Sequence, residues 1–396
     1  MILALSAAGL ASLLVFYHTP SSLPPATQIV GHVYFLSSGQ LNEQTNQGID
    51  DEIEIDLSHL TSPANGKSYY AWLLSDTSAA KAIALGKLPI ENGNASLLYK
   101  NPTHTNLLAL TSRFLVTEEN TATAPTTPSS DLSTWRYYGA FSQKLVSSAE
   151  SMPGMPASTQ GYSYLDHLRH LLADDPMLDA NQLPGGLNIW LYQNTGKVLE
   201  WTSSMRGGWV DNHSMSFVSR QSLRTLAYLD GLSYVSQDLP PNTPLGVTDR
   251  LARIGLLEVN GPTQDPPSYL DSIVFHLNGL LQAGGSTPAL RQQVSALISA
   301  LNDVRDRLQK VRADALQIAN MSNQQLNQPS TLDIINDMIE NATYAYTGWL
   351  DPATGTMHQG VTWIYAHMQE LATITITPYT TSSPQTSTVN TDEEGL

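Results

Sequence analysis

The sequence predicts a multi-domain chain: an N-terminal membrane helix, then an antiparallel β-sandwich, then an all-α helical bundle. Three observations predict this fold class. The first 17 residues are apolar and carry no charged side chain. Short alternating segments separated by turn residues follow, which is the pattern of strands. From residue 162 onward the apolar residues recur at helical spacing.

Residues 1–17 are the predicted membrane segment, a transmembrane or signal-anchor helix. They form an apolar run without proline, at the short limit for crossing a bilayer. We therefore expect the bulk of the chain to be extracytoplasmic or at the cell surface, attached to the membrane through this segment. The alternative is a buried N-terminal core helix, which the polar loops after the segment argue against.

Residues 27–145 make up the predicted β-sandwich. The segment 52–57 alternates apolar and acidic side chains, as a half-buried strand requires. Turn residues at Pro63–Gly66 and Glu91–Asn94 separate neighbouring strands. Six or so short strands at close spacing indicate an antiparallel sandwich. The expected strands are 28–36, 52–57, 69–74, 82–90, 95–99 and 107–116, with a strand-like run at 135–141.

A linker at 146–161, with two Pro and two Gly, precedes the predicted helical bundle of residues 162–373. This change of period predicts two separately folding halves. Residues 374–396 are expected to form an edge strand or tether and then an acidic, disordered tail. The expected helices are 164–172, 187–204, 219–235, 247–259, 269–283, 287–319, 331–346 and 361–373.

The clearest predicted helix covers residues 287–319. Thr287 can cap its start, and Pro288 occupies the first helical position, where a missing N–H costs nothing. Its apolar residues recur at alternating steps of four and three over four heptads. The pattern predicts the spine of an intramolecular bundle, with a dimeric coiled coil as the alternative.

Composition limits the sites and partners that the chain can have. Its 396 residues include no cysteine, 19 basic and 35 acidic side chains, for a net charge of −16. The lack of cysteine excludes disulfides, thiolate metal sites and iron–sulfur clusters. The acidic balance argues against a nucleic-acid partner, because such binding needs clustered Lys and Arg. We expect no cofactor.

Strong catalytic motifs are missing from the sequence. It contains no P-loop, no G-x-S-x-G, no H-E-x-x-H and no G-x-G-x-x-G after a strand. We therefore expect a non-enzymatic protein with no catalytic residues.

The candidate site is a pair of histidines on one predicted helix. His167 and His170 lie three residues apart, with Asp166, Asp174 and Asp175 close in sequence. This spacing can present two imidazoles to one metal ion. The alternative is that both histidines are hydrogen-bonded or exposed side chains with a structural role.

A short repeat bears on this candidate site. The tetrapeptide Ser163–Asp166 recurs as Ser268–Asp271, and each copy is followed by a His-Leu pair, at His170 and His276. The repeat weakly indicates a duplicated helical hairpin. A third metal ligand such as His276 has to be brought to the pair by the fold.

Five tryptophans concentrate in the helical half. Their spacing is typical of core packing, and the alternative is a stacking surface for a sugar or a peptide groove. They are Trp190, Trp201, Trp209, Trp349 and Trp363.

Turn and packing motifs of the β half occur in a defined order. They are Leu60–Pro63, Gly66–Leu73, Leu85–Leu88 and Phe114–Glu118. In this order, residues 28–130 resemble the extracytoplasmic C-terminal domain of anti-sigma-K factors. The resemblance implies a β-sandwich sensor domain behind a membrane helix. The printed sequence has no cysteine and no residues ahead of the apolar segment, so the resemblance does not extend to a sigma-binding module, and it does not reach the helical half.

These observations favour three functions in turn. The first is a membrane-anchored sensing or protein-interaction protein that uses the helical bundle as its partner surface. The second is a secreted or cell-surface structural protein that assembles as a homo-oligomer. The third is a metal-binding helical domain centred on His167 and His170.

Overall fold

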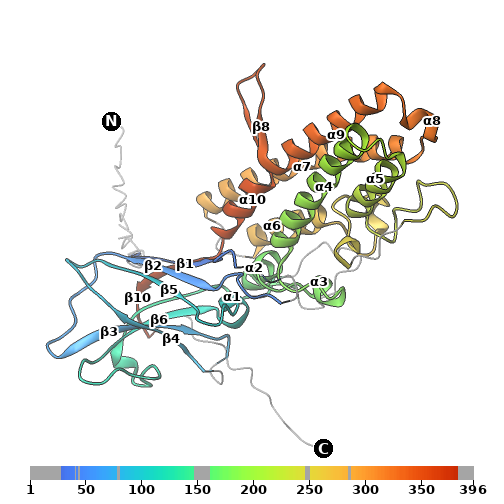
Figure 1. Cartoon of the computed structure of the whole chain (residues 1–396). Coiled ribbons are helices and arrows are strands. Elements are labelled where there is room, and N and C mark those ends of the chain that lie inside the picture. The colour runs from blue at the N-terminus through green and yellow to red at the C-terminus, as the bar shows by residue number, and fades with distance from the viewer. Residues whose placement is uncertain are drawn as a thin grey trace, which may run out of the picture.

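The computed structural model describes residues 28–40, 42, 45–77, 81–146, 161–245, 250–283 and 287–381. Figure 1 shows a curled sheet beside a bundle of long helices. Two short helices, α2 (Tyr164–Leu172) and α3 (Pro176–Ala180), lie between the sheet and the bundle.

Eight antiparallel strands form one sheet in the order β4-β3-β6-β7-β10-β1-β2-β5. The sheet curls so far that its edge strands β4 and β5 contact each other. The predicted two-layer sandwich is therefore corrected to a single, nearly closed sheet. The strands are β1 (Gly31–Leu36), β2 (Glu52–Leu57), β3 (Lys67–Leu74), β4 (Ile83–Leu88), β5 (Ala95–Lys100), β6 (Arg113–Asn120), β7 (Trp135–Ala140) and β10 (Thr373–Pro378).

Strand β10 comes from the far end of the chain and lies inside the sheet. It pairs with β1 along Tyr34 to Gly31 and with β7 at Tyr138 and Tyr137. The prediction of an edge strand or a disordered tail is wrong for residues 374–378, because β10 has a hydrogen-bonded neighbour on each side. The rest of the predicted tail, 382–396, lies outside the described residues.

Alternation explains why these segments form strands. In β1, Val33 and Phe35 are fully buried while the residues between them are partly exposed. In β10, Ile374 and Ile376 are buried and Thr375 is exposed. Successive side chains of a strand point to opposite faces, so each strand presents one apolar face to the core.

The remaining helices are α1 (Leu107–Leu110), α4 (Leu187–Val210), α5 (Met215–Asp230), α6 (Tyr269–Gln282), α7 (Pro288–Ala319), α8 (Asn323–Leu326), α9 (Pro329–Thr347) and α10 (Val361–Gln369). Among them, α4, α5, α6, α7, α9 and α10 follow the predicted order with shifted ends, whereas the short α1 and α8 were not predicted. A hairpin of β8 (Gly348–Leu350) and β9 (Met357–Gln359), which the sequence analysis missed, joins α9 to α10.

Two expected elements are wrong. In place of the helix at 247–259, the described residues hold only a short 3-10 turn at Arg250–Ala252, and residues 246–249 lie outside the described part. Leu256 and Leu257 instead donate backbone hydrogen bonds to the carbonyls of Tyr228 and Leu229 at the end of α5, so this apolar run is a buried irregular segment. The expected strand at 107–116 begins as α1, because Asn106 caps the N–H of Ala109.

Helix α7 is the spine of the bundle. Thr287 accepts a hydrogen bond from the Leu290 N–H, which confirms the predicted cap. The helix packs against α5, α6, α9 and α10 of the same chain. The intramolecular interpretation is confirmed, since the seam that a coiled-coil dimer needs is buried within the chain. The buried seam residues are Val294, Leu297, Leu301, Val304, Leu308, Val311, Ala315 and Ile318.

Among the described residues, the structure contains no helix that is both long enough and apolar enough to span a membrane. The longest helices, α7 and α4, carry charged side chains along their length, such as Arg307 and Lys310 on α7. The predicted segment 1–17 lies outside the described residues. Among the described residues, the predicted fold class is therefore corrected to a nearly closed antiparallel sheet joined to a helical bundle, with no membrane helix.

Candidate metal centre

The repeated tetrapeptide marks the starts of two helices that pack on each other, α2 and α6. Ser163 accepts a hydrogen bond from the Asp166 N–H, and the Asp166 carboxylate accepts one from the Ser163 N–H. Ser268 accepts in the same way from the Asp271 N–H. The repeat is therefore a helix-capping sequence used twice, and it sets where both helices begin.

The packing of α2 on α6 brings three histidines together. His167 and His170 face α6, and His276 of α6 is fully buried between them. The ring centroid of His276 lies 4.7 Å from that of His170 and 5.2 Å from that of His167. The predicted pair thus gains the third histidine that only the fold could supply.

Asp175 adds a carboxylate to this group from the turn between α2 and α3. It caps α3, since its Oδ1 atom accepts hydrogen bonds from the N–H groups of Met177 and Leu178 at 2.9 Å and 3.1 Å. Its Oδ2 atom lies 3.9 Å from Nε2 of His276. One carboxylate oxygen therefore holds the helix start while the other faces the histidines.

Three buried polar atoms converge on one point. His170, Asp175 and His276 each offer one ligand atom that lies within 4.8 Å of the atoms offered by the other two. Nδ1 of His170, Oδ2 of Asp175 and Nε2 of His276 are buried and lack a hydrogen-bond partner among the described residues. A buried polar atom without a partner costs about 1–3 kcal/mol. Three of them facing one another indicate that the site is built for something that binds all three.

Burial fixes the charges in this group. It lowers the pKa of His167 and of His170 to about 4, and it lowers the pKa of His276 well below its usual value. Burial also raises the pKa of Asp175 to about 6, against the opposing effect of its two backbone hydrogen bonds. At neutral pH the imidazoles are therefore uncharged, each ring has one nitrogen with a lone pair, and the Asp175–His276 contact is not an ion pair. The centre carries the single negative charge of Asp175.

His167 holds His276 in place. The Nδ1 atoms of the two rings are 2.9 Å apart, so one donates a hydrogen bond to the other. Since this contact occupies Nδ1 of His276, its Nε2 is the nitrogen that faces Asp175. His167 thus positions His276, and the candidate ligand set is His170, Asp175 and His276.

Tyr269 and Gly279, both on α6, close the centre. The hydroxyl of the fully buried Tyr269 has no hydrogen-bond partner among the described residues. Burial and the nearby Asp175 charge raise the pKa of Tyr269, so its O–H stays protonated and can donate to a ligand. A Cβ atom at Gly279 would lie only 2.1 Å from Cε1 of His167, so glycine is required for this close approach.

Helix α2 also anchors the centre to the sheet. The Arg169 guanidinium donates to both carboxylate oxygens of Asp76 at 2.7 Å and 2.9 Å and to the Leu108 carbonyl at 2.9 Å. Leu165 donates its N–H to the carbonyl of Ser142. One face of α2 therefore contacts the sheet side while the other carries the histidines.

The tryptophans do not form one surface. Trp190 is buried, and Trp201 contacts the guanidinium of Arg224 at 5.0 Å. Trp209 donates to the carbonyl of Leu326, which ties α4 to α8. Trp349 lies on the β8–β9 hairpin, and Trp363 faces the junction between sheet and bundle.

Protein-family models, curated proteins and solved structures were compared with this chain, and none matches it. The motifs behind the resemblance to anti-sigma-K sensor domains lie largely in β3 and β6, where Tyr69 and Trp72 are buried. These are packing positions, and the resemblance stays a prediction.

Proposed function

We propose that this protein binds one divalent transition-metal ion at His170, Asp175 and His276, in the way that zinc-binding proteins do. The observation that carries the proposal is the convergence of three buried, unpartnered donor atoms from α2, the α3 cap and α6. A cation at their centre satisfies all three atoms and neutralises the buried carboxylate.

The donor set favours zinc-type ions over calcium or magnesium. Two imidazole nitrogens and one carboxylate oxygen are typical Zn²⁺ ligands, whereas Ca²⁺ and Mg²⁺ select oxygen ligands. Zn–N bonds of about 2.0–2.1 Å place tetrahedral ligand atoms roughly 3.4 Å apart. The 3.9 Å between Asp175 Oδ2 and His276 Nε2 is close to that spacing, so small side-chain rotations complete the site.

The proposed ion has a structural role. Three protein ligands leave the fourth tetrahedral position of a zinc ion open, but all three are buried, which favours a structural ion over one that meets substrate. The ion joins α6 of the bundle to α2, which Arg169 fastens to Asp76 on the sheet side. Metal binding therefore stabilises the junction between the two parts of the molecule.

Metal titration of the purified full chain tests the proposal. After dialysis against a chelator, we expect one Zn²⁺ per chain by calorimetry and elemental analysis, and no binding of Ca²⁺ or Mg²⁺. Asp175→Asn keeps the oxygen that caps α3 and removes the negative charge. We therefore expect this variant to fold, and its affinity for Zn²⁺ to fall at least tenfold. His59→Ala, at an exposed position outside the centre, is the matched control. Unchanged affinity in both Asp175→Asn and His170→Gln contradicts the proposal.

A second candidate function, protein interaction, is favoured by the β8–β9 hairpin. The hairpin projects from the bundle (Figure 1). Leu350 and Met357 are a cross-strand pair, and their side chains are 62% and 49% exposed. A contiguous exposed apolar pair at the end of a projecting element is typical of a contact surface. Light scattering on the wild type and on a Leu350→Ser/Met357→Ser variant tests whether this pair joins copies of the chain. We expect the wild type to be an oligomer and the variant to be a monomer.

A further inference from the structure

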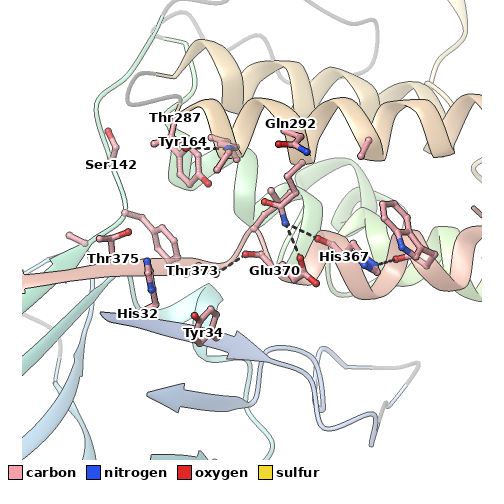
Figure 2. Close-up of a pocket in the computed structure, with 18 residues that line it drawn as sticks. His32, Tyr34, Ser142, Tyr164, Thr287, Gln292, His367, Glu370, Thr373 and Thr375 are labelled. Carbon is pink, nitrogen blue, oxygen red and sulfur yellow. Dashed lines mark hydrogen bonds between the residues drawn. The ribbon is translucent and has the colours of Figure 1, made fainter. Parts of the chain in front are cut away.

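A groove of about 840 Å³ lies where the sheet meets the bundle. Figure 2 shows its walls: strands β1 and β10 on one side, and helices α7 and α10 on the other. This volume is in the range of ligand sites, which occur preferentially where two structural units meet.

The sheet wall is polar and aromatic where ordinary packing against a bundle would be apolar. His32 and Tyr34 of β1 alternate with buried core residues and point away from the core, into the groove. Their direct cross-strand neighbours in β10 are Thr375 and Thr373. This wall therefore presents two aromatic rings and two hydroxyls.

The helical walls combine small, amide and aromatic side chains. Ala289, Gln292 and Ala296 lie on one exposed face of the first turns of α7, ahead of its buried seam. The alanines leave the floor of the groove open. Trp363 and His367 lie one turn apart on α10, with their rings stacked at 3.9 Å between centroids.

Hydrogen bonds hold the polar groups of the groove in position. His367 Nδ1 donates to the Trp363 carbonyl at 2.9 Å, which fixes the orientation of the ring. The Gln293 amide donates to the His367 carbonyl and to the Glu370 carboxylate, each at 3.3 Å. Figure 2 shows these contacts as dashed lines along α10. The groove thus offers fixed donors and acceptors beside aromatic rings.

The charge of the lining disfavours an anionic ligand. None of the described lining residues is Lys or Arg, and Glu370 is the one carboxylate among them. A phosphorylated or acidic ligand would find no cation there. Amide, hydroxyl, imidazole and carboxylate groups match hydroxyls that both donate and accept, and ring faces match the apolar C–H faces of pyranose rings.

We infer that this groove binds a neutral oligosaccharide, with Trp363 and Tyr34 contacting sugar rings and Gln292, Gln293 and Glu370 contacting hydroxyls. This site is separate from the proposed metal centre, and the inference does not depend on that proposal. None of its lining residues belongs to the ligand set of the metal.

Calorimetric titration of the full chain with maltohexaose, cellohexaose, chitohexaose and xylohexaose tests the inference, and a neutral proline-rich decapeptide is titrated in parallel. We expect at least one of the four sugars to bind. Trp363→Ala should weaken that binding at least tenfold, and Gln292→Arg, at an exposed position, should block the groove without touching the core. Trp349→Ala, on the β8–β9 hairpin and outside the lining of the groove, should leave the affinity unchanged. Binding of the peptide alone, binding of none of the probes, or sugar binding that survives both groove variants overturns the inference.

Discussion

The Nδ1 atoms of His167 and His276 lie 2.9 Å apart across the interface of α2 and α6. Only one ring of such a pair can donate, so the contact couples the protonation states of the two imidazoles. When His276 donates through Nδ1, its Nε2 carries a lone pair aimed at Asp175. This is the outer-shell arrangement that orients metal-binding histidines.

The first prediction concerns Gly279, against which the His167 ring packs. In Gly279→Ala, the new Cβ would lie 2.1–2.6 Å from three atoms of that ring. The buried ring cannot move without losing its contact with His276, so we expect a loss of about 1–3 kcal/mol in the free energy of unfolding. Urea denaturation measures this loss.

Gly207→Ala is the matched control, because it also replaces a glycine inside a helix. A Cβ there would have no atom nearer than 3.7 Å apart from its own helix. Since alanine favours helix over glycine by about 0.8–1.0 kcal/mol, we expect this variant to be unchanged or more stable. Equal destabilisation of the two variants would show that the contact with His167 is not the cause.

The second prediction concerns pH and the carboxyl pair Asp314 and Asp337 between α7 and α9. Burial, and then the hydrogen bond with Asp337, raise the pKa of Asp314 to about 7. A raised carboxyl pKa means that the folded state binds the proton more tightly than the unfolded state does. Because of this pair, the free energy of unfolding decreases progressively as the pH rises from about 4 through about 7.

Asp314→Asn removes this titration. We expect the variant to be more stable than the wild type at pH 8, by about 1 kcal/mol after allowance for solvent screening, with a smaller difference at pH 5. Thermal unfolding across this pH range measures the effect, and Asp333→Asn, an exposed position on α9, is the control. A difference in stability between Asp314→Asn and the wild type that stays the same across the pH range would contradict the prediction.

The third prediction concerns the α7 seam. Leu308 is fully buried within the chain, so Leu308→Ala should cost about 2–5 kcal/mol in the free energy of unfolding. Its mass in solution should equal that of the wild type, since the seam packs against helices of the same chain. The exposed neighbour Gln309→Ala should change stability by less than about 0.5 kcal/mol. A lower mass for folded Leu308→Ala would indicate that the seam joins two chains.

The fourth prediction concerns strand β10, which follows the whole bundle in sequence yet lies between β1 and β7. A fragment ending at residue 146 lacks β10, so β1 and β7 each lose the partner on one of their two edges. We expect this fragment to aggregate, and to become soluble when it is co-expressed with residues 161–381. A soluble, folded fragment with the β-type circular dichroism of a complete sheet would show that β10 is dispensable.

The helices were largely predictable because their starts and periods are local signals. Residues 164–172 are bounded in the structure as predicted, and the predicted α7 starts one residue early, at its cap. The cap at Ser163 and the seam of α7 each lie within a few residues of the elements that they define. The apolar run near Leu256 was wrongly predicted as a helix, because apolar spacing alone does not distinguish a buried helix from a buried irregular segment.

The sheet was less predictable, because its closure depends on contacts between distant residues. Val33 pairs with Ile374, which is far away in the sequence, and no pattern of neighbouring residues predicts this pairing. The segment Thr373–Thr377 alternates threonine and isoleucine, which does indicate a strand, but strand patterns do not reveal partners.

The candidate site was predictable in part. The spacing of His167 and His170 was a usable signal, and His276 stood at a matching place in the repeated sequence. The different proposed roles of His167 and His170 could not be predicted from the sequence. They depend on the packing of α2 on α6, which makes His170 a proposed ligand and His167 a positioning residue. Asp175 was noted as a neighbour in sequence, but its two roles follow from the α3 cap.

Anomalous diffraction at the zinc edge, from crystals of the full chain grown with Zn²⁺, tests the central claim most directly. We predict one strong anomalous peak per chain, within about 2.2 Å of His170 Nδ1, Asp175 Oδ2 and His276 Nε2. Crystals of Asp175→Asn grown at the same Zn²⁺ concentration should show a weaker peak or none at this position. A wild-type map with no anomalous peak there, and with an ordered water molecule joining the three atoms, would contradict the account.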